Sequence, residues 1–191
     1  MTTAFVLGNG VSRQGLDLSQ LRRHGKIYGC NALYREFVPD VLVATDRPIA
    51  TAIQESGYAL KNQFYTRRPI DGLGAHKVPK PYFGYSSGPI AAAVAAEHNN
   101  NTVYILGFDM GPIDNNRINN VYAGTEFYKP LDALPTFTGN WIKQIIHITS
   151  DFPNTLFVRV HGPTTAQVAQ FDTVLNLKQL DLSAFLNQLN G

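Results

Sequence analysis

The chain has 191 residues, of which 44% are hydrophobic and 16% are charged, and its formal net charge at pH 7 is +2. This length can bury one sizeable core, so we expect a single domain over residues 1–191. The small net charge argues against a nucleic-acid partner, and no apolar run approaches the roughly 18 residues that a membrane span needs. The single cysteine, Cys30, excludes an internal disulfide, and no signal peptide is recognisable, so we expect a cytoplasmic protein.

Runs rich in β-branched and aromatic residues alternate with helix-like segments along the chain. We expect strands at residues 4–7, 26–30, 40–45, 63–66, 102–106 and 155–160. We expect helices at residues 16–23, 48–56, 89–98, 140–151 and 182–189. This alternation predicts an α/β, Rossmann-like fold, in which a parallel sheet carries helices on both faces. Irregular loops are expected at residues 67–86 and 111–138, and the second is long enough to act as a lid.

Polar residues follow several of the expected strands. They are Asn9, Asn31, Asp46, Asp109 and His161. Ligands of open parallel sheets bind beyond the carboxyl ends of the strands, so these side chains are expected to meet at one edge. Gly8 and Gly10 flank Asn9 and leave space for a ligand to approach the backbone.

Two further features indicate a nucleotide ligand. Asn31 follows the first turn by about twenty residues, where dinucleotide-binding folds place an acidic residue on the ribose, and an uncharged amide there could bond a ribose hydroxyl or a base edge. Ser86, Ser87 and Gly88 precede an alanine-rich helix, where serine caps and free amides are typical of a phosphate site. Arg13 stands at the third position of a GxGxxG pattern, which argues against a standard NAD site. Each feature also has a purely structural interpretation, as a tight turn or a helix cap.

The stretches "LGNGVSRQGLDLSQL", "YGCNALYREFVPD", "SSGPIAAAVAA" and "VYILGFDM" together resemble the small bacterial sialyltransferases that use CMP-sialic acid. They resemble, less closely, other proteins with the same nucleotide domain, some of which transfer pyrophosphate to pterins. The resemblance covers roughly residues 3–46 and 84–163. It implies that Asn9, Asn31 and Ser87 bind the CMP part of the donor. The full set of expected nucleotide-binding residues is Gly8, Asn9, Gly10, Ser12, Asn31, Asp46, Ser86, Ser87 and Gly88.

The sequence departs from that family at its catalytic positions. Asn140 stands where the family has a general-base histidine, and an amide cannot act as a base. The family has two tyrosines that stabilise the leaving phosphate, and Gly111 stands at the position of the first. The family also has an arginine ahead of the serine-glycine pair, and Gly84 stands near that position. His161 and Asp109 are therefore the candidates for a base. The candidates for lid or leaving-phosphate contacts are Arg117, Tyr122 and Tyr128.

No D-x-D motif and no Cys or His cluster indicates a metal site. We therefore expect a metal-independent glycosyltransferase without a cofactor, whose co-substrate is a nucleotide-sugar donor, CMP-linked, and whose partner is a small-molecule or glycan acceptor. The composition is also compatible with a homo-oligomer. Two alternatives stay open: a nucleotide-binding protein without turnover, and a pyrophosphotransferase of the pterin branch.

Overall fold

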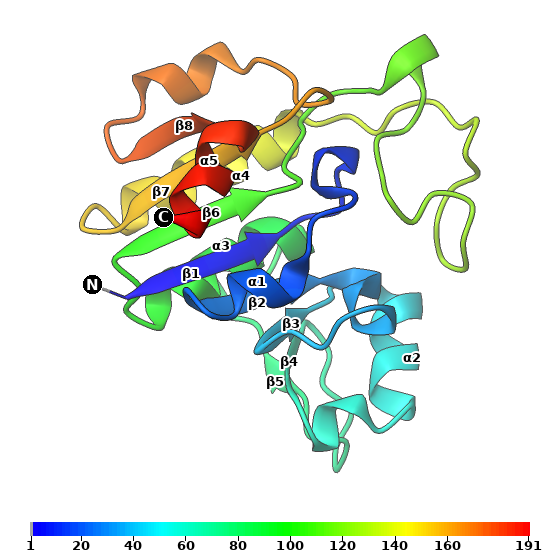
Figure 1. Cartoon of the computed structure of the whole chain (residues 1–191). Coiled ribbons are helices and arrows are strands. Elements are labelled where there is room, and N and C mark those ends of the chain that lie inside the picture. Colours follow the sequence, from blue (N-terminus) through cyan, green and yellow to red (C-terminus); the bar gives the residue numbers. More distant parts are fainter. Residues whose placement is uncertain (1) are drawn as a thin grey trace.

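The computed structural model describes residues 2–191, which form one sheet of eight parallel strands (Figure 1). The order across the sheet is β5-β4-β3-β2-β1-β6-β7-β8. The strands are β1 (Thr3–Leu7), β2 (Lys26–Cys30), β3 (Val41–Val43), β4 (Gln63–Thr66), β5 (His76–Lys77), β6 (Thr102–Leu106), β7 (Leu156–His161) and β8 (Leu177–Asp181). The predicted α/β, Rossmann-like architecture is confirmed.

Five α-helices accompany the sheet in the described residues, together with short 3-10 segments. The α-helices are α1 (Leu18–Leu21), α2 (Arg47–Glu55), α3 (Ser87–Glu97), α4 (Gly139–Asp151) and α5 (Leu182–Asn190). The 3-10 segments are η1 (Val11–Arg13), η2 (Asn31–Arg35), η3 (Tyr58–Leu60), η4 (Lys80–Tyr82), η5 (Asp114–Asn116) and η6 (Ala169–Thr173). Within residues 2–191, no helix combines the length and apolar character needed to cross a membrane.

Alternation along the strands decides which helices cover each face. In β1, Ala4 and Val6 belong to the buried cluster that contains α3 and α4, whereas Phe5 and Leu7 belong to the cluster that contains α1, α2 and α5. Successive strand residues point to opposite faces, so apolar residues at both kinds of position require cover on both sides. The helices accordingly lie on both faces of the sheet (Figure 1).

Helix α3 is buried on all sides because it is built mainly from small residues. Its alanines at positions 91, 92, 93, 95 and 96 are all buried, and it contacts both the sheet and α4. Short side chains let the helix axis approach the strands closely. The amino end of α3 is therefore held firmly beside the carboxyl ends of the central strands.

Two strands lie where the sequence did not predict them. Strand β5 falls inside the expected irregular segment 67–86, and β8 directly precedes the last helix. Residues 111–138 form the expected long loop, with η5 as its only helical segment among the described residues. Helix α1 is shorter than the predicted helix at residues 16–23 and begins after Asp17, whose carboxylate accepts a hydrogen bond from the Ser19 nitrogen.

Candidate functional site

A cavity of about 380 Å³ lies at the carboxyl edge of the sheet. It is lined by segments that follow β1, β2, β3 and β6, and the strand order reverses at the β1–β6 pair. Such a reversal is where open α/β sheets bind their ligands. The predicted site residues that line this cavity are Gly8, Asn9, Gly10, Asn31, Asp46, Ser86, Ser87, Gly88, Asp109 and Tyr128.

The turn after β1 comes very close to the turn after β6. A Cβ atom on Gly8 would lie 2.6 Å from the Gly107 oxygen, and one on Gly10 would lie 2.5 Å from the Asp109 Cγ. Only glycine fits at these two positions without displacement of the neighbouring turn. The glycines of the "LGNG" sequence therefore serve the close approach of two loops, and this approach forms one wall of the cavity.

Asn9 is held by its backbone and keeps its side-chain nitrogen free. Its carbonyl oxygen accepts a hydrogen bond of 2.8 Å from the Val121 nitrogen, and its Oδ1 lies 3.7 Å from the Cys30 Sγ. Within residues 2–191 its Nδ2 donates no hydrogen bond. An amide donor without a partner in a cavity wall is available to a ligand.

Arg13 braces the same turn from the side away from the cavity. Its buried guanidinium donates to the Gly8 oxygen from Nε at 2.6 Å, and to the Tyr122 hydroxyl from Nη2 at 2.8 Å. Glu36 completes the cluster, since it accepts from both Arg13 and Tyr122. This role of Arg13 was not predicted from the sequence, although its place at the third position of a GxGxxG pattern was a signal. Tyr122 packs in this cluster and does not line the cavity.

Asn31 directly follows β2, at the start of η2, and has a left-handed backbone conformation with φ of 53°. Asparagine tolerates this region better than most residues. Its side-chain Oδ1 is buried and has no hydrogen-bond partner within the described residues. A buried amide oxygen without a hydrogen-bond partner is costly, and a hydrogen-bond donor of a ligand that reached this oxygen would reduce that cost.

The serines before α3 do not cap the helix, contrary to the sequence prediction. Neither side chain makes a capping hydrogen bond. The Ser87 Oγ instead bonds the nitrogen and the Oγ1 of Thr45, each at 3.0 Å. The Ser86 Oγ accepts a bond of 2.9 Å from the Trp141 Nε1. Both hydroxyls are thus engaged by long-range hydrogen bonds, that of Ser87 with the segment after β3 and that of Ser86 with α4.

The amino end of α3 consequently presents free backbone donors. Within residues 2–191, the N–H groups of Ser87 and Gly88 form no hydrogen bond, and both residues line the cavity. Arg67 and Lys129 also line it and add positive charge. Uncapped amides at the positive end of an 11-residue helix, together with two cations, suit a phosphate group.

Asp109 lies in the cavity wall, but its carboxylate is occupied. It accepts hydrogen bonds from the Ser12 nitrogen at 2.9 Å, the Ser12 hydroxyl, the Thr164 hydroxyl at 2.9 Å and the Thr165 hydroxyl at 3.2 Å. These bonds join the loop after β6 to the loops after β1 and β7. Ser12, which was expected to bind nucleotide, is engaged here and does not line the cavity.

Other predicted residues lie away from the cavity lining. His161 is the last residue of β7 and is in register with Asp181 of β8. Arg117 donates from its Nε to the backbone oxygen of Asp114 in the long loop. Neither lines the cavity, and Asn140 is exposed at the start of α4, although its neighbour Trp141 does line it.

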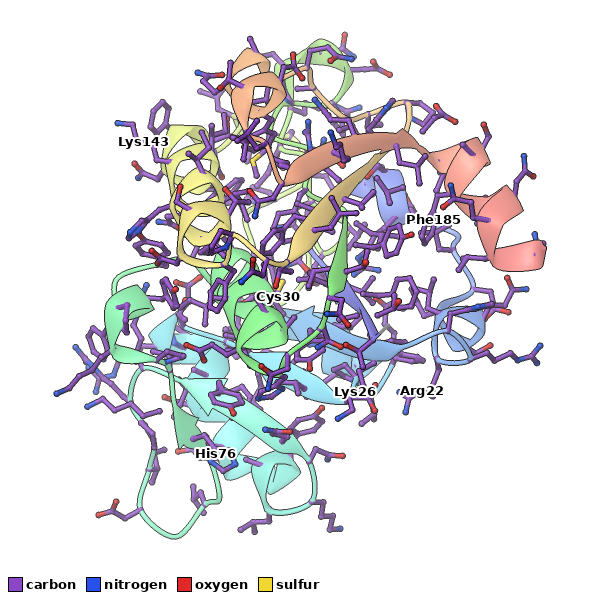
Figure 2. All side chains as sticks on the ribbon, turned by 90° about the vertical axis from the view of Figure 1, so that its left-hand side faces the viewer. Arg22, Lys26, Cys30, His76, Lys143 and Phe185 are labelled. Atoms are coloured by element: carbon purple, nitrogen blue, oxygen red, sulfur yellow. The ribbon has the colours of Figure 1, made fainter. Side chains whose placement is uncertain are left out.

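Asp46 is the carboxylate in the cavity wall that makes no hydrogen bond to the described residues. It is exposed and does not cap α2, although it precedes that helix. Cys30, also in the lining, lies in the interior of the molecule (Figure 2), and burial raises the pKa of its thiol to about 12. The thiol is therefore neutral at physiological pH.

The long loop is anchored on one side and apolar on the other. Asn119 accepts from the Val11 nitrogen at 2.8 Å, and the Tyr128 hydroxyl accepts from the Ala32 nitrogen at 3.2 Å. Burial raises the pKa of Tyr128, so its hydroxyl stays protonated. Farther along, Leu134 and Phe137 are 73% and 76% exposed. The loop thus contributes Asn119 and Tyr128 to the cavity lining and exposes the apolar side chains of Leu134 and Phe137.

Within residues 2–191, no group of three or more His, Cys, Asp or Glu side chains is arranged to hold a metal ion. Comparisons with protein-family models, curated proteins and solved structures find no match to the chain.

Proposed function

We propose that the cavity binds a nucleotide-activated sugar, CMP-linked, and that the chain transfers the sugar to a small-molecule or glycan acceptor. One observation carries the proposal. Asn9, Asn31 and Ser87, which the resemblance to small bacterial sialyltransferases matches to the donor nucleotide, all line the same cavity. Its volume of about 380 Å³ lies within the usual range for small-molecule sites.

The free donors and acceptors of the cavity suggest a role for each group. The amides of Asn9 and Asn31 would bond the base or ribose, and the Ser87 and Gly88 amides would bond the phosphate. Arg67 and Lys129 would stabilise the charge on the departing nucleotide. The acceptor oxygen attacks the anomeric carbon as the bond from that carbon to the phosphate oxygen breaks.

Asp46 is our candidate for the group that takes the acceptor proton. His161 lies outside the lining and the Asp109 carboxylate already accepts four hydrogen bonds, whereas the Asp46 carboxylate is unengaged. A base must reach the proton that it abstracts, and only a lining residue meets this condition. The proton then passes from Asp46 to water after the product leaves.

A nucleotide-binding protein without turnover is the second candidate. It is favoured by Asn140, an exposed amide at the position where the resemblance places a histidine base. A pyrophosphotransferase would instead use ATP, so the identity of the nucleotide separates it from the other two.

Trp141 provides a direct test of nucleotide binding, because it is the one tryptophan of the chain and lines the cavity. We expect CMP and CDP to change its fluorescence saturably, and ATP to leave it unchanged. Asn9→Ala should weaken CMP binding about tenfold through the loss of one or two hydrogen bonds. Ser150→Ala, on the exposed face of α4, is the control. If no nucleotide alters fluorescence or the melting temperature, the proposal fails.

Release of CMP from CMP-sialic acid separates the enzyme from the binder. Asp46→Asn should bind CMP as the wild type does but release it at least about 100-fold more slowly, as expected when a general base is removed. If wild type and Asp46→Asn both bind CMP but release it from CMP-sialic acid only at the rate seen without protein, the chain is a nucleotide-binding protein without turnover.

A further inference from the structure

Five cations gather beyond the carboxyl ends of β3, β4 and β5, beside the cavity. We call this group the basic rim, and its members are Arg47, Arg67, Arg68, Lys77 and Lys80. Arg47 begins α2 after β3, Arg67 and Arg68 follow β4 directly, Lys77 ends β5 and Lys80 begins η4. Since the carboxyl ends of parallel strands share one edge of a sheet, these residues lie on the edge that holds the cavity.

The charge of the chain is concentrated at this rim. Residues 47–86 contain six Lys or Arg and two Asp or Glu, a net charge of +4, whereas the whole chain has +2. The remaining residues therefore have a net charge of −2. This asymmetry creates a local positive field that the small overall charge conceals.

The rim cations are not neutralised by the protein. The ion pairs of the described residues are Arg13–Glu36, Arg22–Asp40 and His147–Asp151, and none includes a member of the rim. Four of the five side chains are exposed, and Arg67 is half-buried. Asp46 precedes Arg47 and Asp71 lies near Arg68 in the sequence, but neither carboxylate forms an ion pair with the rim. The cluster therefore keeps a net positive charge, and an anionic ligand would reduce the repulsion within it.

Arg67 connects the rim to the cavity. It lines the cavity and is fixed by bonds to the Phe83 oxygen at 2.7 Å and the Tyr85 oxygen at 2.6 Å. The Lys77 Nζ lies 5.6 Å from the centre of the Phe83 ring, which is 42% exposed. Arg67 and Lys77 thus contact the same short segment, residues 83–85, and Arg67 belongs both to the rim and to the cavity lining.

We propose that the exposed members of the basic rim, which are Arg47, Arg68, Lys77 and Lys80, bind the acceptor of the sugar transfer, and that this acceptor is an anionic saccharide with carboxylate or phosphate groups. This inference rests on the proposed function, because it assigns the second substrate of the same site. A saccharide is favoured over nucleic acid because the rim is short and the rest of the chain is net negative, which disfavours a long polyanion.

The test uses fluorescently labelled tetragalacturonate, with maltotetraose as its neutral counterpart. The rim variant combines Arg68→Glu, Lys77→Glu and Lys80→Glu, none of which lines the cavity. The control variant combines Arg23→Glu, Lys143→Glu and Lys178→Glu, exposed residues elsewhere on the surface. Lys143 lies at the other end of the molecule from His76 of β5 (Figure 2).

We expect the wild type to bind tetragalacturonate, to bind it more weakly as salt is raised, and not to bind maltotetraose. The rim variant should bind about tenfold more weakly, since each exposed ion pair changes affinity by a factor of a few, while the control variant binds as the wild type does. Equal binding by the rim variant, or equal binding of maltotetraose, overturns the inference. Tighter binding of oligothymidylate would assign the rim to single-stranded nucleic acid and also overturn it.

A CMP titration that is followed by the fluorescence of Trp141 distinguishes this inference from the proposed function. Unchanged CMP binding by a rim variant that has lost tetragalacturonate binding supports a separate acceptor surface. CMP binding without any tetragalacturonate binding rejects the anionic acceptor and leaves the proposed function standing. Tetragalacturonate binding without CMP binding rejects both, because no sugar donor would then occupy the cavity.

Discussion

The hydroxyl of Ser87 lies 3.0 Å from both the nitrogen and the hydroxyl of Thr45, and these contacts join the start of α3 to the end of β3. Both residues are buried. The free amides of α3 are therefore positioned by a side-chain contact between two elements that are distant in the sequence. The geometry of the expected phosphate site depends on this contact.

We expect Ser87→Ala to lower the free energy of unfolding by about 1–3 kcal/mol, because the buried Thr45 nitrogen loses its acceptor. CMP affinity should fall in parallel, because the end of α3 is no longer fixed. Urea denaturation and the Trp141 titration measure the two effects. Ser150→Ala, at an exposed position, should change neither. An unchanged stability would show that the Thr45 contact is not formed.

The closeness of the two glycine turns leads to a second expectation. Gly10→Ala introduces a Cβ at 2.5 Å from the Asp109 Cγ and 2.7 Å from the Gly107 oxygen, so the turn must move. We expect a loss of about 1–3 kcal/mol, as found for overpacked sites. Gly84→Ala is the matched control, because a Cβ there meets no atom within 4 Å. Equal melting temperatures for the two variants would contradict this description of the turn.

Asp109→Asn tests whether this residue is structural. The amide nitrogen cannot accept, so some of the bonds from Ser12, Thr164 and Thr165 are lost. We expect a loss of about 1.5–3 kcal/mol, the usual contribution of a hydrogen bond to a charged group. Urea denaturation measures it, with the exposed Asp114→Asn as control. A variant of normal stability that no longer releases CMP from the donor would instead identify Asp109 as the base.

Cys30 gives a pH-dependent expectation. Burial raises the pKa of its thiol from an ordinary 9.0 to about 12, so the folded protein keeps a proton that the unfolded chain loses. The stability from this proton is present below pH 9 and decreases as pH rises toward 12. Between pH 8 and pH 10, wild type should lose more unfolding free energy than Cys30→Ala.

Thiol labelling checks the same point directly. At pH 8 the folded protein should react slowly with a thiol reagent, and the protein unfolded in urea should react at once. Rapid labelling of the folded protein, or an identical pH dependence for Cys30→Ala, would contradict the burial of the thiol.

Strand patterns in the sequence were sufficient to predict the sheet, except at its edges. The run at residues 26–30 coincides with β2, because strands covered on both faces must be apolar along their length. Strand β5 contains only His76 and Lys77, both exposed, so no apolar pattern indicated it. The edge strand β8 mixes exposed and half-buried positions and was missed for a similar reason.

The location of the site was predictable, but its internal contacts were not. Asn9 and Asn31 line the same cavity because the carboxyl ends of parallel strands share an edge of the sheet. His161 also ends a strand, but β6 separates its strand, β7, from β1, β2 and β3, whose carboxyl ends border the cavity. Local sequence patterns do not reveal the order of strands in a sheet. The roles of Arg13 and Ser87 depend on side chains that meet across distant segments, which no periodicity reveals.

The brace that Arg13 forms with Gly8 and Tyr122 involves only protein atoms and is complete without any bound molecule. The turn after β1 is thus preorganised, so little conformational entropy of this turn would be lost when a ligand binds. Association at this site should resemble rigid docking, in which selectivity comes from the fit of a fixed shape more than from rearrangement of the protein.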